Sequence, residues 1–216
     1  MVAFIYLCIL LFMIIFSLYL IYLNSSKCPI KIRKFYLVSL LIIVVRYLSL
    51  LSLWLIQRQR VIYSIKILTH LNFVAIPLLI LAAIYIFLRD EKRKFDYNYI
   101  VMIILFLGYF IINVFYKLDI RVDTVFGFIV NYREILIPNL IYLIVISSFV
   151  IITILFVDKQ YSNTCGMRLL LISLIITVIE FIIFLGGFRI FPYPLVGEMC
   201  IIGCSYKAIS TFKIKK

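Results

Sequence analysis

The sequence predicts an all-α fold, a polytopic transmembrane bundle of seven helices with the N-terminus outside and the C-terminus inside. Apolar residues make up 66% of the 216 residues, against about 45–50% in soluble chains. Mean hydropathy is +1.21, and only 14% of the residues are charged. Because such a chain cannot hide its apolar surface from water, we expect its solvent to be lipid.

Seven apolar segments have the length of roughly 18 to 23 residues that a helix needs to cross the hydrocarbon of a bilayer. We expect spanning helices near residues 2–23, 35–56, 67–88, 97–116, 135–157, 169–188 and 191–209. The first segment lacks a basic n-region and is too long for a cleavable signal, so we expect it to remain as a helix. The spans use nearly the whole chain, and we expect residues 1–216 to form a single transmembrane domain with no soluble domain.

The distribution of Lys and Arg predicts the orientation. With the N-terminus outside, 14 of the 22 Lys and Arg residues fall in the cytoplasmic loops 24–34, 89–96 and 158–168 and at the C-terminal end, and seven fall outside. This bias follows the positive-inside rule. We assign the net charge of +13 to contact between these basic loops and anionic lipid headgroups, not to nucleic acid. We expect a multi-pass protein of the cell membrane, specifically a bacterial plasma membrane.

Two charged residues stand near the middle of predicted spans. Arg46 lies in span 35–56 and Glu180 in span 169–188, and a charge at the bilayer centre costs about 3 kcal/mol on insertion scales. A rise of 1.5 Å per residue places both roughly 12 to 15 Å from the outer surface. We therefore expect an ion pair between Arg46 and Glu180. Glu198, about 10 Å deep by the same rise, adds a carboxylate that this pair does not neutralise.

Further polar residues gather at the predicted outer end of the bundle. Together with the three charges they form one candidate network for ligand binding: Arg46, Glu180, Glu198, His70, Asn72, Asn113 and Asn139. This arrangement predicts a polar pocket open to the outside, for a small polar ligand or a protein partner. The alternative is that the charges and amides only fix the packing of neighbouring helices.

Catalytic and metal-binding motifs are missing from the sequence. It contains no H-E-x-x-H, no G-x-S-x-G and no P-loop, and its one His is too few for a metal site. The five cysteines form no C-x-x-C, so we expect free thiols and neither metal nor cofactor. We do not expect an enzyme.

Three classes of function remain. Seven spans with an outer pocket resemble, in layout, the membrane input modules of bacterial sensor proteins, which implies a sensor-like or regulatory membrane subunit. A division into three helices, a linker and three helices resembles the PQ-loop sugar carriers, which implies a small-solute or proton-coupled transporter, although the Pro-Gln motif of that family is absent. A structural or assembly protein is the third class. We favour the sensor.

Overall fold

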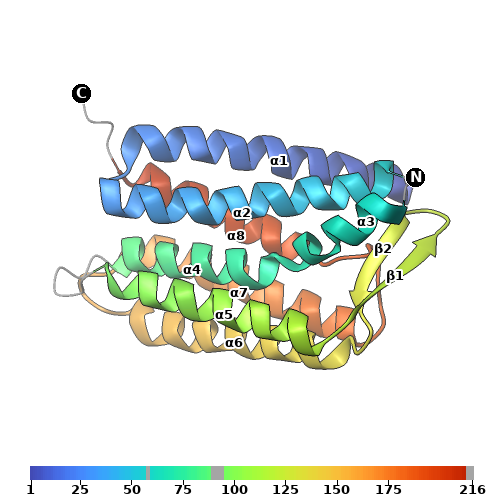
Figure 1. The fold of residues 1–216 in the computed structure, drawn as a ribbon. Coiled ribbons are helices and arrows are strands. Elements are labelled where there is room, and N and C mark those ends of the chain that lie inside the picture. Colours follow the sequence, from blue (N-terminus) through green and yellow to red (C-terminus); the bar gives the residue numbers. More distant parts are fainter. Residues whose placement is uncertain (57–58, 89–94, 213–216) are drawn as a thin grey trace.

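The computed structural model describes residues 1–56, 59–88 and 95–212, and it is a bundle of long helices that lie side by side (Figure 1). The long helices are α1 (Val2–Lys27), α2 (Ile30–Leu55), α4 (Asn72–Leu88), α5 (Tyr97–Phe115), α6 (Leu136–Val157), α7 (Thr164–Leu185) and α8 (Val196–Ser210). Two short elements, α3 (Gln59–Ile65) and the 3-10 helix η1 (Lys66–His70), precede α4. The predicted all-α bundle of seven long helices is confirmed.

Membrane-spanning character is clear for most of the bundle. Within the described residues, six helical segments are long and apolar enough to cross a membrane: Val2–Lys27, Ile30–Leu55, Arg60–Leu88, Tyr97–Phe115, Leu136–Val157 and Thr164–Leu185. These segments make the chain a membrane-embedded protein. Which side faces the cytosol stays a prediction, and part of its basis, residues 89–94 and 213–216, lies outside the described part of the chain.

The last helix is shorter than the sequence predicted. We expected a span over 191–209, but α8 begins only at Val196 and has 15 residues. Pro192 and Pro194 explain the difference, because a proline disfavours helical backbone in the residue before it. Residues 186–195 therefore form an irregular segment between α7 and α8.

A β-hairpin follows α5, in a stretch where the sequence analysis expected only a loop. Strand β1 (Leu118–Asp123) pairs antiparallel with β2 (Gly127–Tyr132). The Asp123 carboxylate accepts hydrogen bonds from the amides of Val125 (2.7 Å) and Phe126 (3.0 Å), which fixes the turn. Gly127 has a φ of 74°, a conformation that glycine adopts without strain.

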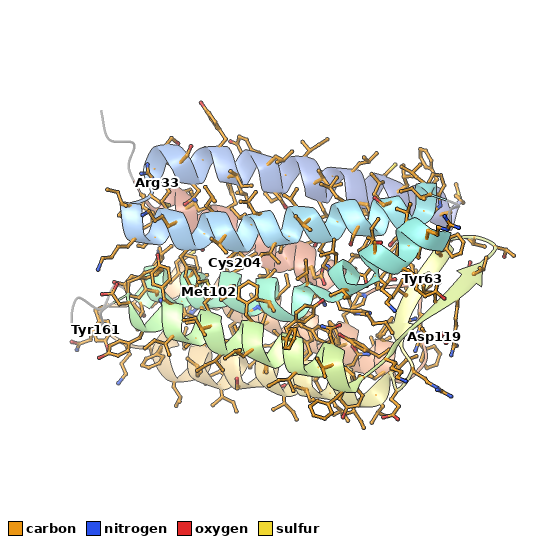
Figure 2. All side chains as sticks on the ribbon, in the orientation of Figure 1. Arg33, Tyr63, Met102, Asp119, Tyr161 and Cys204 are labelled. Carbon is orange, nitrogen blue, oxygen red and sulfur yellow. The ribbon has the colours of Figure 1, made fainter. Side chains whose placement is uncertain are left out.

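The hairpin packs on one end of the bundle. Val130 and Tyr132 of β2 are buried, and Gly127 lies against the end of α2, where an added Cβ would meet the Leu53 carbonyl oxygen at 3.2 Å. The start of α1 lies at this end and the end of α8 at the other (Figure 1). Figure 2 likewise shows Asp119 at the hairpin end and Arg33 at the opposite end. We call these the hairpin end and the far end.

Helix α4 occupies the centre of the bundle. It contacts α2, α5, α6, α7 and α8, and all of its 17 residues except Leu81 and Tyr85 are buried. In α5, by contrast, Tyr109 is the one buried residue of a helix that is described throughout. The exposed apolar face of α5 is suited to lipid, as expected for a helix at the edge of a membrane bundle.

Candidate functional site

A buried ion pair joins two helices from opposite ends of the chain. Arg46 of α2 donates from Nη1 to Oε2 of Glu198, in the first turn of α8, and each side chain is only 1% exposed. The Tyr47 hydroxyl donates to the same carboxylate oxygen at 2.8 Å. The predicted pairing of Arg46 with Glu180 is therefore wrong: the partner of Arg46 is Glu198.

Arg46 also connects α2 to the short helix η1. Its Nε donates to the Thr69 carbonyl oxygen at 3.0 Å, and its guanidinium carbon lies 5.4 Å from the centre of the Tyr47 ring. A planar guanidinium offers several donors in fixed directions, so one side chain can bind two groups at once. Arg46 thus fixes the positions of α2, η1 and α8 relative to one another.

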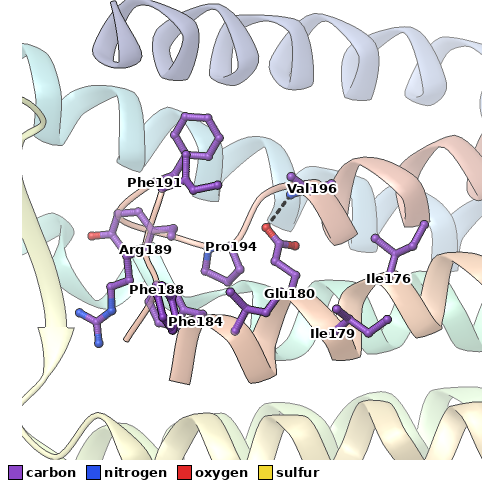
Figure 3. Close-up of a pocket in the computed structure, with 12 residues that line it drawn as sticks. Ile176, Ile179, Glu180, Phe184, Phe188, Arg189, Phe191, Pro194 and Val196 are labelled. Carbon is purple, nitrogen blue, oxygen red and sulfur yellow. Dashed lines mark hydrogen bonds between the residues drawn. The ribbon is translucent and has the colours of Figure 1, made fainter. Parts of the chain in front are cut away.

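Glu180 caps α8 and forms no ion pair within the described part of the chain. Its Oε1 accepts from the backbone amides of Leu195 and Val196, both at 2.9 Å, and its Oε2 accepts from the Gly197 amide at 2.6 Å. Figure 3 shows the bond to Val196. The first amides of a helix have no partner within the helix, and its N-terminus carries a partial positive charge. The N-terminus of α8 therefore binds the Glu180 carboxylate, in the role that we had expected for the Arg46 guanidinium.

The late start of α8 explains the wrong pairing. Because α8 begins at Val196, its N-terminus lies beside Glu180 of α7. Gly197 allows this close approach, since a Cβ there would lie 2.6 Å from the Thr177 Cα. The sequence analysis compared only the depths of the charges in the membrane. Depth alone could not show that the backbone at the start of α8 would lie beside Glu180.

Aromatic and polar contacts link the hairpin to the start of α8. The Tyr193 hydroxyl accepts a hydrogen bond from the Val130 amide at 2.9 Å and lies 3.1 Å from the Val130 carbonyl oxygen, to which it donates. The centre of the His70 ring is 4.6 Å from that of Tyr132. Burial raises the pKa of Tyr132 and of Tyr193 above the ordinary value, so both hydroxyls stay protonated and able to donate.

Within the described residues, Arg46 and Glu198 are buried at the place where we expected a pocket open to the outside. The hairpin packs over this end of the bundle, Arg46 is 1% exposed and Glu198 is fully buried, and neither residue lines the five cavities that we describe. Glu180 lines a cavity of about 540 Å³, which has mostly apolar walls. The ion pair of Arg46 and Glu198, which could recognise a polar ligand, is thus buried, whereas the cavity beside Glu180 is mainly apolar.

Two of the predicted amide residues serve local structure. The Asn113 amide donates to the Tyr109 carbonyl oxygen at 2.8 Å and accepts from the Tyr132 hydroxyl at 3.4 Å. Asn139 donates to the Ile135 carbonyl oxygen at 2.9 Å, one turn earlier. Asn113 therefore contacts the hairpin, whereas the hydrogen bond of Asn139 stays within the start of α6.

Within residues 1–56, 59–88 and 95–212, four buried polar atoms in the half of the bundle nearer the hairpin have no hydrogen-bond partner. They are Nε2 of His70, Oδ1 of Asn72, the hydroxyl oxygen of Tyr142 and Oε1 of Glu198. Buried polar atoms are normally bonded to protein or to ordered water. Such atoms, contributed by η1, α4, α6 and α8, are suitable places for bound water.

The sequence analysis missed Tyr47, Thr69, Tyr142 and Tyr193. The chain contains 16 tyrosines, so a single tyrosine carries no signal, and Thr69 acts through its backbone oxygen. The described residues also contain no group of three or more His, Cys, Asp or Glu side chains that could hold a metal ion. Comparisons with family models, with curated proteins and with solved structures found no match.

Proposed function

We propose that this integral membrane protein is a sensor-like or regulatory membrane subunit, without catalytic activity, in which the hairpin controls the position of α8. The observation that carries this proposal is the pair of hydrogen bonds between Tyr193 and Val130. They connect the hairpin directly to the segment from which α8 starts. A ligand or partner that moves the hairpin would therefore move this segment as well.

The start of α8 is held on two sides. Glu180 of α7 binds its first amides, and Arg46 of α2 binds Glu198 in its first turn. A change that breaks either contact leaves a buried or partly buried charge without its partner, which is costly. Such a start favours a small number of discrete positions, as a two-state element requires.

Helix α8 runs from within the bundle to the far end, and the segment 186–195 connects its start with the hairpin end (Figure 1). When one end of a rigid helix shifts, the other end shifts as well. Binding at the hairpin can therefore move the end of α8 at the opposite membrane surface. A ligand shifts such an equilibrium only by its different affinity for the two positions. We place the recognition of a small polar ligand or a protein partner at the hairpin, because the charges beneath it are covered.

The transporter remains the alternative, and one observation favours it. The unpartnered Oε1 of Glu198 and hydroxyl of Tyr142 are groups at which water could enter and a proton could move. A transporter would use Glu198 to couple the movement of a solute to that of a proton. The vesicle experiment below separates this activity from sensing.

Coupling can be measured as a distance between two spin labels. In a variant without native cysteines, labels at Val125 in the hairpin turn, 51% exposed, and at Tyr206 in α8, 41% exposed, would report the separation of the two ends. We expect Glu198→Gln to shift or broaden this distance distribution, because it removes the charge that holds α8 to α2. Glu134→Gln, an exposed carboxylate near the hairpin end, is the control and should leave it unchanged.

Two results would count against the sensor. Identical distance distributions for Glu198→Gln and Glu134→Gln would show that the buried pair does not control α8. Accumulation of a labelled solute in vesicles, abolished by Glu198→Gln and retained in Glu134→Gln, would assign the protein to the transporters.

A further inference from the structure

Two cavities lie along the outside of α7 and share one residue. The outer cavity, about 540 Å³, lies between α7 and the segment 186–195. The inner cavity, about 650 Å³, lies between α7 and α8 nearer the far end. Ile176 lines both, so the two cavities are neighbours along α7, and together we call them the α7 groove.

The walls of the α7 groove are mainly apolar. Ile179, Ile183 and Phe184 line the outer cavity, and Leu169 and Ile172 line the inner one. Glu180 also lines the outer cavity (Figure 3), but its carboxylate already accepts three backbone hydrogen bonds from the start of α8. Volumes of this size with apolar walls are typical of ligand sites, and here the surrounding solvent is lipid.

An arginine stands at each end of the groove. Arg168, in the first turns of α7, lines the inner cavity, and Arg189, just after α7, lines the outer cavity. Both side chains are exposed, and neither forms an ion pair with a carboxylate in the described part of the chain. The Arg189 guanidinium carbon lies 4.6 Å from the centre of the Phe184 ring, and Figure 3 shows its head group turned away from Glu180.

The spacing of the two arginines matches a bilayer. Arg168 lies 17 residues before Leu185, the end of α7, and a rise of 1.5 Å per residue makes this distance about 26 Å; Arg189 lies four residues beyond Leu185. The hydrocarbon of a bilayer is about 30 Å thick. One guanidinium therefore lies at the level of the headgroups on each side, with apolar walls between them.

We propose that the α7 groove binds two anionic phospholipids, one from each leaflet. An acyl chain of each lipid fills one cavity, and its phosphate binds Arg189 at the outer cavity or Arg168 at the inner cavity. Guanidinium and phosphate match in charge and in the geometry of their hydrogen bonds, and basic groups beside membrane helices commonly bind lipid headgroups. The proposal does not depend on the sensor, since it uses neither Arg46 nor Glu198.

The experiment uses the full chain in phosphatidylcholine vesicles with a small fraction of phosphatidylglycerol that carries a photoreactive diazirine at the end of one acyl chain. After illumination, the adducts are mapped by mass spectrometry of peptides. We expect adducts at groove residues such as Ile172, Ile176 and Val196 in excess over exposed apolar residues of α5 such as Ile103 and Ile104. A lipid probe bound in the groove stays there longer than one at the surface of α5, where lipids exchange rapidly with the bulk bilayer.

Substitutions test each end separately. Arg189→Gln should lower labelling of the outer cavity about fivefold, and Arg168→Gln that of the inner cavity about fivefold, since one basic residue near the headgroups changes the affinity by about this factor. Each variant should leave the other cavity unchanged. Arg121→Gln, in the exposed part of β1, is the control and should leave both unchanged.

A second variant fills the inner cavity without changing charge. A Cβ on Gly203, which lines this cavity, would meet no atom within 4 Å, so Gly203→Leu should fold and exclude the acyl chain. Gly108→Leu, equally free of contacts on α5, is its control. Equal labelling of α5 and the groove, or labelling that neither arginine variant nor Gly203→Leu lowers, would overturn the proposal. A groove protected from the probe by a cross-linkable second copy of the chain would also overturn it.

Discussion

At the scale of single residues, Glu198 determines how Arg46 is held. One carboxylate oxygen of Glu198 accepts from both Arg46 and Tyr47, and the other has no partner in the described chain. Replacing a buried ion pair by apolar residues is often neutral, whereas removing one member leaves an uncompensated charge. The ion pair therefore contributes more to fixing the position of α8 against α2 than to the free energy of unfolding.

This asymmetry makes a prediction about variants of the pair. Arg46→Leu and Glu198→Leu should each lower the free energy of unfolding by about 3–5 kcal/mol. The double variant should recover a large part of that loss, because no buried charge remains unpaired. Unfolding of the purified chain in detergent, followed by circular dichroism, measures the three differences.

Glu180 supplies the matched control for this cycle. Its carboxylate binds backbone amides at the start of α8 and not Arg46. Glu180→Gln should therefore be destabilising by about 0.5–2 kcal/mol, the value of a helix cap, and its effect should add to that of Arg46→Leu. Recovery in the Arg46–Glu180 double variant, and none in the Arg46–Glu198 one, would contradict the observed pairing.

At the scale of the elements, the crossing of α7 and α8 places Glu180 and Glu198 at the same helix start. The contact depends on Gly197, which lies directly against the backbone of Thr177. Small residues at such crossings let membrane helices approach closely. The positions of both carboxylates thus depend on a residue that carries no charge.

We predict opposite effects for two glycine-to-alanine variants in α8. Gly197→Ala should lower the free energy of unfolding by about 1–3 kcal/mol, the cost of overpacking, because its Cβ would lie 2.6 Å from the Thr177 Cα. Gly203→Ala, where nothing lies within 4 Å, should raise it by about 0.5–1 kcal/mol through helix propensity. The two midpoints of denaturant unfolding measure these changes, and equal effects would disprove the close crossing.

The sequence predicted the elements better than their ends. Long apolar runs predict membrane helices reliably, because every backbone group in lipid must be bonded within its own helix. The start of α8 was wrong because the apolar run 191–195 continues across Pro192 and Pro194. The hairpin was missed because Leu118–Asp123 alternates polar and apolar residues over a length that equally suits a loop.

At the scale of the whole molecule, the sequence identified the polar interior and not its connections. Arg46, Glu198 and His70 are indeed buried in the bundle, as expensive polar residues in membrane helices should be. The partner of each charge depends on which helices are neighbours and where they end. Those are properties of the packed bundle, and the covering hairpin is the clearest example.

Orientation is the property of the whole molecule that labelling of cysteines can establish. Cys165 lies at the start of α7 and is exposed, whereas Cys28, between α1 and α2, is buried. Burial raises the pKa of the Cys28 thiol to about 11, and only the thiolate reacts readily. With the N-terminus outside, an impermeant maleimide should therefore label Cys165 only after intact cells are permeabilised, and Cys28 in neither case.

A variant that keeps one reactive position at a time completes this test. Val125→Cys, in the turn of the hairpin at the opposite end from Cys165, should react with the maleimide in intact cells when the native cysteines are replaced. Labelling of Cys165 but not of Val125→Cys from outside would reverse the orientation. It would place the hairpin in the cytosol, and a sensor that receives its signal at the hairpin would then respond to a cytosolic ligand or partner.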